Sequence, residues 1–418
     1  MREGERESGA FERGRDDASF PLPDRSQASD PPLPQGEGQS SPRLAVTRVH
    51  LTNFRSYAEA ELEVGSRPVV LAGANGAGKT NILDAISLLA PGRGLRGAKL
   101  SEHIRKGPSA PSEALWAVAA TVKRGEESYE IGTGLALGAN GERRAVRLNG
   151  APAQSSADLG EIVQMIWLVP AMDRLFTESA GGRRRFLDRL VLGFDAGHAR
   201  RAARYETAMR ERARLLKLGP RDPMWLAGLE AEMAEAGAAM AAARAETAAR
   251  LNTMLEERGH AGAFPAAQLA LAGEVDALCA EQGENAEAEM RERFARARLR
   301  DAEAGRTLFG PHLSDLAVRH TQKRADAREC STGEQKALLI SIVLAHAWER
   351  AQHGFAPVLL LDEIAAHLDA RRRAALFEEI LALGTQAWLT GTDLSLFESL
   401  ASRADVFAVD NGRFARQE

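Results

Sequence analysis

The stretch RPVVLAGANGAGKTNILDAISLLA, residues 67–90, decides the fold. It predicts an apolar strand, then a glycine-rich turn, then a helix from about Thr80 to Ala90. The turn GANGAGKT matches the phosphate-binding loop pattern G-x-x-x-x-G-K-[ST] and lies in the strand–turn–helix context that this pattern requires. A chance glycine-rich turn is the alternative, and the context argues against it. The stretch therefore predicts a nucleotide-binding α/β protein.

The residue types in this loop suit a nucleoside triphosphate with its metal ion. Glycines let backbone amides wrap the β- and γ-phosphates, because no Cβ atom stands in the way. Lys79 supplies a positive charge to those phosphates, and Thr80 supplies a hydroxyl ligand for Mg²⁺. We therefore predict ATP and Mg²⁺ as cofactors. The predicted ATP-binding residues are Gly73, Ala74, Asn75, Gly76, Ala77, Gly78, Lys79, Thr80 and Asn81.

Two carboxylates end a second apolar stretch, PVLLLDE at residues 357–363. Asp362 is predicted to hold Mg²⁺ and its waters, and Glu363 to polarise the attacking water. An Asp-Glu pair after an apolar run also often just caps a strand. Combined with the phosphate-binding loop, the pair indicates the catalytic residues of ATP hydrolysis.

The turn CSTGEQKALL, residues 330–339, opens a strongly periodic helix. Ser331, Gly333 and Gln335 form the pattern S-x-G-x-Q, and the free amides of a helix start attract an anion. An ordinary helix cap is the alternative, and it is the better interpretation of the turn taken alone. The phosphate-binding loop comes before this turn and the Asp-Glu strand after it. That order favours a second half of a nucleotide site.

Composition and charge limit the class of protein. The chain of 418 residues is 44% apolar and 27% charged, as in an ordinary globular protein, and its two cysteines fit no metal-ligand spacing. Net charge is −4 overall, and residues 1–42 alone carry −4 (five Arg against nine Asp and Glu), so residues 43–418 balance at zero. Any DNA contact must therefore come from a local patch. We expect no membrane span and no targeting segment, and predict a cytoplasmic protein.

The chain divides by composition into four parts. Residues 1–42 are rich in Pro, Gly, Ser and charge, which predicts a disordered extension or a start site placed too early. Residues 43–182 contain the loop and several alternating strands, and residues 305–418 return to α/β with the turn, the Asp-Glu strand and a closing hairpin. Between them, residues 183–304 predict an inserted helical lobe. Its residues 183–217 and 224–258 are expected to form an antiparallel helical hairpin.

The order of these motifs resembles that of the ATP-binding-cassette (ABC) ATPases, and within them the RecF family of bacterial recombination mediators. The resemblance runs over most of residues 43–418 and implies the fold class: an α/β, ABC-type P-loop ATPase head, SMC-like, with an inserted α-helical lobe. The stretches that carry it are NFRSY (53–57), GANGAGKTNILDAI (73–86), GRGLR (92–96), GGRRRFLD (181–188), GPHLSDL (310–316), the turn at 330–339, LLLDEIAAHLD (359–369) and TGTD (390–393).

The resemblance also implies a mechanism and partners. The S-x-G-x-Q turn would complete the nucleotide site of a second copy, so that ATP is sandwiched in a homodimer. Asp369 would be the D-loop residue that crosses the dimer, and Thr392 the switch residue. The dimer would bind single-stranded, gapped or junction DNA and cooperate with RecR and RecO in loading RecA, in replication, recombinational repair and the SOS response. Hydrolysis would be slow and DNA-dependent, acting as a release switch more than as a turnover reaction.

Two positions depart from the family pattern. Family members tend to carry a carboxylate directly after the proline that ends the strand VQMIWLV, whereas here Ala171 follows Pro170 and Asp173 lies two residues later. The D-loop, commonly Ser-Glu-Leu-Asp in the family, reads AHLD at residues 366–369. The resemblance implies that this serine acts in communication between the two subunits of a dimer, so its loss bears on the strength of that communication.

Arginines on the expected lobe allow three interpretations. Arg183, Arg184, Arg200 and Arg201 are predicted to contact DNA phosphates as a basic strip. One alternative is a solvated helix face paired with acidic residues such as Glu206 and Glu211, and another is a brace between the lobe and the ATPase core. Aromatic residues are 5% of the chain and do not alternate with the basic runs, so we expect DNA binding at the level of the backbone, without base stacking.

Two other classes of protein share the loop and the turn. A transporter-type nucleotide-binding subunit usually separates them by far fewer than the 251 residues (331 minus 80) found here, and it meets a membrane partner. A chromosome-organising head would need far longer helical arms than residues 183–258 provide. The lobe, NFRSY and GPHLSDL therefore favour a DNA-repair ATPase.

Overall fold

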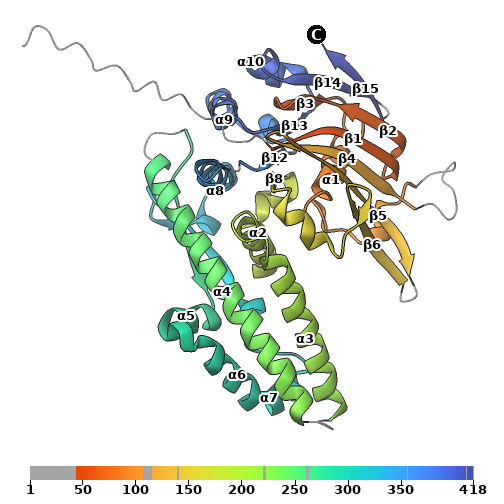
Figure 1. Ribbon diagram of the computed structural model, residues 1–418. Coiled ribbons are helices and arrows are strands. Elements are labelled where there is room, and N and C mark those ends of the chain that lie inside the picture. The colour runs from red at the N-terminus through yellow and green to blue at the C-terminus, as the bar shows by residue number, and fades with distance from the viewer. Residues whose placement is uncertain are drawn as a thin grey trace, which may run out of the picture. The chain divides into compact units, whose positions relative to one another are not determined.

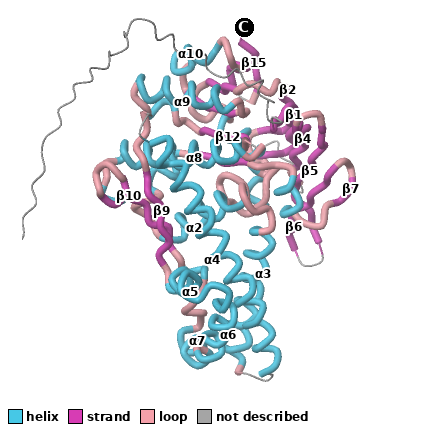
Figure 2. Tube along the Cα trace, turned by 60° about the vertical axis from the view of Figure 1, so that its left-hand side comes forward, coloured by secondary structure: helices cyan, strands magenta, loops and turns pink. Residues whose placement is uncertain are grey.

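Three β-sheets organise the described part of the chain (Figures 1 and 2). The computed structural model describes residues 44–106, 115–138, 141–219, 223–259, 263–354, 356–410 and 412–417. The extension predicted at residues 1–42 lies outside these ranges.

The first sheet is antiparallel and contains the strands that the alternating sequence patterns predicted. Its strand order is β2-β1-β4-β5-β6-β7. In β2 and β4 buried residues alternate with exposed ones, because one face of the sheet packs on the core and the other meets solvent. The bounds are β1 Leu44–Phe54, β2 Tyr57–Glu63, β4 Ala117–Arg124, β5 Glu127–Gly138, β6 Gly141–Leu148 and β7 Ala151–Pro152.

The second sheet carries the phosphate-binding loop. Its strand order is β15-β14-β3-β13-β12-β8, and neighbouring strands are parallel except β14 with β15. Every residue of β3, β8, β12 and β13 is buried, which is why these strands read as short uninterrupted apolar runs. The bounds are β3 Val69–Ala72, β8 Met165–Leu168, β12 Val358–Leu361, β13 Ala387–Gly391, β14 Asp405–Asp410 and β15 Arg413–Gln417.

Four helices lie in the same segments of the chain as this sheet. They are α1 Lys79–Ser87, α8 Thr332–Gln352, α9 Ala370–Leu383 and α10 Glu398–Ala401. α8 is buried along most of its length. Across all the helices of the described residues, none is both long and apolar enough to cross a membrane.

A buried glutamine joins the first sheet to the second. The Oε1 atom of Gln386 accepts from the Val46 N–H (2.8 Å), and its Nε2 donates to the carbonyls of Val46 (3.0 Å) and Gly65 (2.8 Å). Oε1 also accepts from the indole N–H of Trp388 (3.0 Å). Because both ends of this fully buried amide are used, β13 is held against β1.

The predicted helical hairpin is present, but its first arm is two helices. α3 (His198–Leu218) and α4 (Pro223–Gly259) pack side by side (Figure 1). The prediction of one helix over residues 183–217 is wrong, because α2 (Ala180–Leu192) ends at Gly193 and α3 begins after Gly197. A side chain at Gly193 would collide with the His346 ring on α8, and the Asp195 carboxylate accepts from the Gly197 N–H (3.0 Å). Periodicity shows neither this packing nor this hydrogen bond.

A strand lies within the stretch predicted as the helical lobe. β9 (Ala267–Ala272) pairs antiparallel with β10 (Asp315–His320), and β10 pairs with β11 (Ala325–Asp326), which completes the third sheet. Figure 2 shows β9 and β10 side by side. Three helices follow β9 and pack on α3 and α4: α5 Glu274–Gln282, α6 Ala286–Arg296 and α7 Arg298–Ala304. Residues 183–304 are therefore tied to residues 305–418 through a sheet.

The lobe has a hydrophobic core of its own with a buried arginine beside it. The core side chains are Tyr205, Ala208, Met233, Ala234, Ala236, Met240, Ala241, Val275, Leu278, Ala286, Met290, Phe294 and Phe309. The fully buried guanidinium of Arg212 donates to Glu230 on α4 (3.0 Å) and to Asp301 on α7 (2.7 Å). These ion pairs join three helices of the lobe.

Replacing Arg212 by Met should destabilise the lobe by about 3–5 kcal/mol, because Glu230 and Asp301 lose a buried counter-charge. The measurement is urea unfolding followed by circular dichroism. Arg214→Met is the matched control on the same helix, since Arg214 pairs with Glu211 at 3.0 Å in a largely exposed place, and it should cost about 0–1 kcal/mol. Equal losses for both variants would contradict the buried ion-pair cluster.

Stability should fall in mild acid because of His346. This buried ring on α8 donates from Nε2 to the Leu190 carbonyl (3.0 Å), and burial lowers the pKa of His346 from 6.5 to about 4. As the pH falls, His346 is therefore protonated near pH 6.5 in the unfolded chain but only near pH 4 in the folded chain. Between pH 7 and pH 5 the wild type should lose about 2 kcal/mol more unfolding free energy than His346→Gln, measured by urea unfolding at both pH values. Equal pH dependence of the two would contradict a neutral His346.

Candidate nucleotide-binding site

The predicted loop and carboxylates meet at the carboxyl ends of three parallel strands. The loop follows β3 and Asp362 follows β12, and β13 lies between these two strands in the sheet. Carboxyl ends of parallel strands share one edge of a sheet, where α/β proteins bind ligands. Residues about 280 positions apart, such as Thr80 and Asp362, therefore come into contact.

Lys79 is drawn into the phosphate-binding loop. Its ammonium donates to the carbonyls of Gly73 (2.7 Å) and Ala74 (2.9 Å), and the residue is 4% exposed. Burial lowers the pKa of Lys79, and the nearby charges of Glu363 and Asp362 oppose that shift. The loop thus holds a cation at the start of α1, where the backbone amides of a helix N-terminus also favour an anion.

The segment NFRSY fixes the loop from one side. The Tyr57 hydroxyl donates to the Gly78 carbonyl (3.0 Å), and burial raises the pKa of Tyr57, so the phenol keeps its proton. Gly78 has φ 111°, and a Cβ there would lie 2.5 Å from the Tyr57 hydroxyl. The Asn81 amide donates to Ser56 (2.9 Å) and accepts from Arg96 (3.1 Å). Sequence reasoning placed Gly78 and Asn81 in the site but gave Ser56, Tyr57 and Arg96 no role in it.

The side chain of Asp362 joins the end of β12 to β13 and to the start of α1. Its carboxylate accepts from the Thr80 hydroxyl at 2.9 and 3.1 Å and from the Thr390 hydroxyl at 2.7 Å. Thr390 in turn accepts from the backbone N–H of Glu363 (2.9 Å). Glu363 has φ 53°, a left-handed conformation that non-glycine residues seldom adopt and that often marks functional sites.

The residues around Asp362 fit a magnesium ion. A threonine hydroxyl and a carboxylate converge within hydrogen-bond distance, and Mg²⁺ takes oxygen ligands of this kind, with nucleotide phosphates and waters completing its octahedron. Thr80 and Asp362 would hold the ion, which supplies charge neutralisation at the phosphates. The described residues contain no cluster of three or more His, Cys, Asp or Glu that could bind a metal without such phosphates.

Residues 330–335, here called the signature turn, begin α8. Ser331 is the N-cap of α8, and its N–H (3.0 Å) and hydroxyl (2.9 Å) both donate to the Glu334 carboxylate. Lys323 pairs with the same carboxylate, and these contacts lower the pKa of Glu334 to about 2. Ser331 and Gly333 thus lie at a capped helix start, the arrangement that the ordinary-cap interpretation predicted. Their contact with the nucleotide of a second copy stays a prediction.

Gln335 lies inside the protein and not on the face of this turn. It is 4% exposed, and its amide donates to the carbonyl of Cys330 (2.9 Å). The structure therefore gives Gln335 the role of holding the turn in shape, whereas the sequence predicted a contact with the nucleotide of a second copy.

The remaining predicted site residues lie on exposed turns. Asp369 is the N-cap of α9, where its carboxylate accepts from the Arg372 N–H (2.9 Å). Thr392 follows β13 and is exposed, whereas Thr390 within β13 contacts Asp362. Sequence reasoning chose Thr392 in TGTD and missed Thr390. The apolar run before the first threonine, which places that residue in the strand, is the signal that could have found it.

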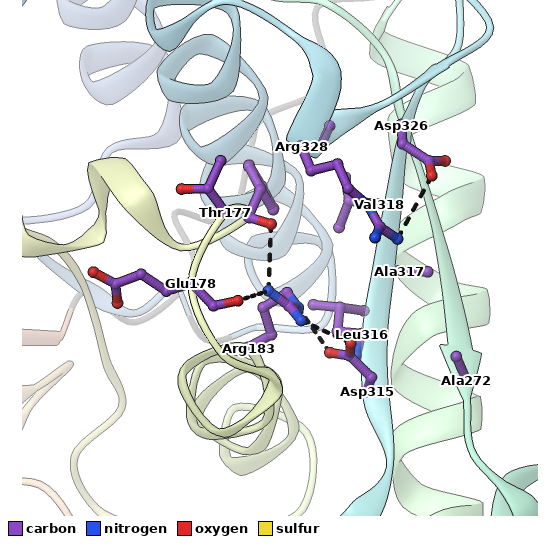
Figure 3. Close-up of a pocket in the computed structure, with 12 residues that line it drawn as sticks. Thr177, Glu178, Arg183, Ala272, Asp315, Leu316, Ala317, Val318, Asp326 and Arg328 are labelled. Carbon is purple, nitrogen blue, oxygen red and sulfur yellow. Dashed lines mark hydrogen bonds and ion pairs between the residues drawn. The ribbon is translucent and has the colours of Figure 1, made fainter.

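Two of the predicted DNA-binding arginines brace the lobe against the core. Arg183 donates to Asp315 on β10 (2.7 and 2.8 Å) and to the backbone carbonyl of Glu178 (2.5 Å), as Figure 3 shows. Arg184 donates to the Ser314 carbonyl (2.7 Å). Both partners belong to GPHLSDL, so two stretches quoted for the family resemblance bind each other. This arrangement matches the brace interpretation.

The other two arginines are paired with acidic residues. Arg200 is half-exposed and lies 3.0 Å from Asp158, and Arg201 pairs with Asp195. The acidic partners of Arg200 and Arg201 are thus Asp158 and Asp195, and not Glu206 and Glu211 as expected from the sequence. Arg200 therefore remains the most accessible of the four predicted DNA contacts.

Fold and site together define the class of protein: an α/β P-loop ATPase head of the ABC type with an inserted helical lobe. A family model described as RecF/RecN/SMC N terminal domain matches residues 45–414. Proteins named DNA replication and repair protein RecF are 50% identical over 371 residues in Agrobacterium fabrum (88% of this chain, 98% of that one) and 48% identical over 372 residues in Rhizobium etli (89% and 98%). This chain belongs to the RecF family.

Solved structures confirm the predicted fold class. A structure described as the recombination mediator protein RecF-ATP in the RecFOR pathway has a TM-score of 0.78 at 21% identity and covers 92% of this chain and 100% of its own. An Smc head domain from Pyrococcus furiosus with an extended coiled coil has a TM-score of 0.51 at 18% identity, covering 90% and 96%. At these identities the likeness concerns the fold.

Thr390→Val should weaken ATP binding in the presence of Mg²⁺ by about tenfold, because Asp362 loses a hydroxyl donor to its charge. Binding is measured by titration of a fluorescent ATP analogue with Mg²⁺ and with EDTA. Thr392→Val is the matched control and should bind like the wild type. With EDTA the difference between the variants should shrink. Equal weakening by both substitutions would contradict the role given to Thr390.

Proposed function

We propose that this chain is an ATP-dependent DNA-binding protein of replication and recombinational repair, which dimerises on ATP and releases DNA on slow hydrolysis. The observation that supports the proposal is the contact of Thr80 and Thr390 with Asp362, which brings the start of α1, β13 and the end of β12 together where Mg²⁺–ATP would bind. Relatives at 48–50% identity that are named DNA replication and repair protein RecF supply the biological setting.

ATP would bind with its β- and γ-phosphates in the loop at residues 73–80. Lys79 would exchange its carbonyl partners at Gly73 and Ala74 for phosphate oxygens, since a negative phosphate is the stronger acceptor. Thr80 and Asp362 would hold Mg²⁺. Glu363 directly follows Asp362, and its carboxylate would accept a proton from the attacking water.

A second copy would close the site. Ser331 and the amides near Gly333 start a long buried helix, and positive charge at a helix N-terminus suits the γ-phosphate of a facing nucleotide. The hydrogen bonds of the signature turn go to Glu334, Cys330 and Lys323, while those of the phosphate-binding loop go to Tyr57, Ser56 and Asp362. The two half-sites therefore have separate partners within one chain, which fits a sandwich between two chains.

DNA binding would depend on the dimer more than on a strongly basic surface. Residues 43–418 balance at zero charge, so a single copy has little electrostatic attraction for DNA. Joining two copies doubles each local basic patch and makes the affinity depend on ATP. Arg183 and Arg184 brace the lobe against the core, so we leave them out of the proposed DNA contact. Arg200 and Arg201 remain in it. By analogy with the RecFOR pathway of the solved RecF structures, RecR and RecO are the proposed partners and RecA the protein that is loaded.

Four proteins test the proposal: the wild type, Lys79→Ala, Ser331→Ala and Glu363→Gln. Lys79→Ala should lose ATP binding. Ser331→Ala should bind ATP yet fail to dimerise, and Glu363→Gln should slow hydrolysis by about a hundredfold and accumulate an ATP dimer on gapped DNA. The measurements are light scattering for dimerisation and fluorescence anisotropy for gapped DNA, each with and without ATP.

The shared control is DNA binding without nucleotide, which should be equally weak for all four proteins. If Ser331→Ala dimerises normally with ATP, the sandwich assignment fails. DNA binding by Lys79→Ala at the wild-type level in ATP would overturn the ATP switch.

A further inference from the structure

A buried lysine follows the signature turn by one residue. Lys336 lies in the second turn of α8 and is 5% exposed, with its Nζ 3.3 Å from Oδ1 and 3.4 Å from Oδ2 of Asp173. Asp173 belongs to the short 3₁₀ helix Pro170–Arg174 and is one third exposed. An ammonium at this depth is costly to hold without a counter-charge, so Asp173 fixes where α8 begins relative to that 3₁₀ helix.

The 3₁₀ helix is in turn tied to the nucleotide site of the same chain. It follows β8, which pairs in parallel with β12, and the Asp362 N–H donates to the Leu168 carbonyl at the end of β8 (2.9 Å). Lys336 is thus connected to the proposed magnesium ligand through one ion pair, five residues of chain and one backbone hydrogen bond. The same connection places the signature turn at a fixed offset from Asp362.

The other end of this segment is held by the lobe. Arg183 donates to the carbonyls of Leu175 (3.2 Å), Phe176 (3.3 Å) and Glu178 (2.5 Å). Figure 3 shows Arg183 between residues 177–178 and Asp315. These residues line a cavity of about 320 Å³. Asp326 and Arg328, which precede Ser331 in the sequence, line the same cavity. The cavity leaves one side of residues 326–328 without packing, so the Lys336–Asp173 pair adds to the hydrogen bonds of Glu334 and Gln335 in positioning the signature turn.

We propose that the Lys336–Asp173 ion pair positions the signature turn for the nucleotide of a second copy. This inference rests on the proposed ATP sandwich and adds two residues to it, neither of which touches the nucleotide. In a symmetric dimer each chain binds one ATP with its phosphate-binding loop and the other ATP with its signature turn. A shift of the signature turn relative to the loop would therefore weaken both nucleotide sites. Asp173 would then serve in place of the family's carboxylate beside Pro170.

The test is a charge swap, with Asp173→Lys, Lys336→Asp and the double variant Asp173→Lys/Lys336→Asp. Each single variant should dimerise in ATP about tenfold more weakly, and the double should recover most of that loss, as coupled neighbours do. ATP affinity of the monomer should stay within about twofold in all three, because the residues of the loop are untouched. Dimerisation is measured by analytical ultracentrifugation and monomer affinity with a fluorescent ATP analogue.

Three controls separate this inference from general damage and from the proposed function. Glu378→Lys reverses an exposed pair with Arg403 (2.6 Å) and should leave the dimer unchanged. Asp173→Asn is the milder variant if Lys336→Asp does not fold, and it should also weaken the dimer while the monomer stays folded at the temperature of the assay. If Ser331→Ala loses the dimer while Asp173→Asn and Asp173→Lys keep it, the positioning role is refuted and the sandwich stands. If Ser331→Ala also dimerises normally, the sandwich itself fails.

Discussion

The carboxylate of Asp362 is the constraint on which the rest of the site depends. It follows β12, and its donors come from α1 and from β13, so it joins three elements that the chain visits in the order α1, β12, β13. A carboxylate this buried needs charge or hydrogen bonds to offset its lost hydration, and the two threonine hydroxyls supply them. The same geometry that satisfies Asp362 in the protein presents hard oxygen atoms to a magnesium ion. The carboxylate of Asp362 therefore both stabilises the fold and is suited to bind the metal ion.

Around this centre, arginines and lysines act mainly as internal connectors. Arg212 joins three helices of the lobe, Arg183 joins α2 to β10, and Lys336 joins α8 to the segment after β8. Each is engaged by a carboxylate. Beyond residue 42, 49 basic residues (54 minus 5) are balanced by 49 acidic ones (58 minus 9). Basic runs in the sequence of a DNA-repair family are thus a poor guide to where DNA would bind, because the fold uses several of these residues for its own internal ion pairs.

The fold class and the centre of the site could be predicted because their signals are local. The pattern of the phosphate-binding loop lies within the eight residues 73–80. The buried strands β3, β12 and β13 can be recognised because their sequences are largely apolar. Three features were not predicted. The break between α2 and α3 depends on packing of Gly193 against His346, 153 residues later (346 minus 193). Thr390 took its role from facing Asp362, and Gln335 from being turned inward, and side-chain direction at a strand end or a helix start is set by tertiary contacts.

The pairing of β3 also governs when this protein becomes functional during its synthesis. Val69 of β3 lies opposite Trp388 on β13 and Asp405 on β14, partners that are 319 and 336 residues further along the chain (388 minus 69, 405 minus 69). At about 5–20 residues per second a ribosome needs roughly 15–65 s to make that interval. Throughout it the apolar strand that carries the phosphate-binding loop has neither neighbour. The nucleotide site is therefore among the last parts to form, and a chain that stops before β13 lacks it.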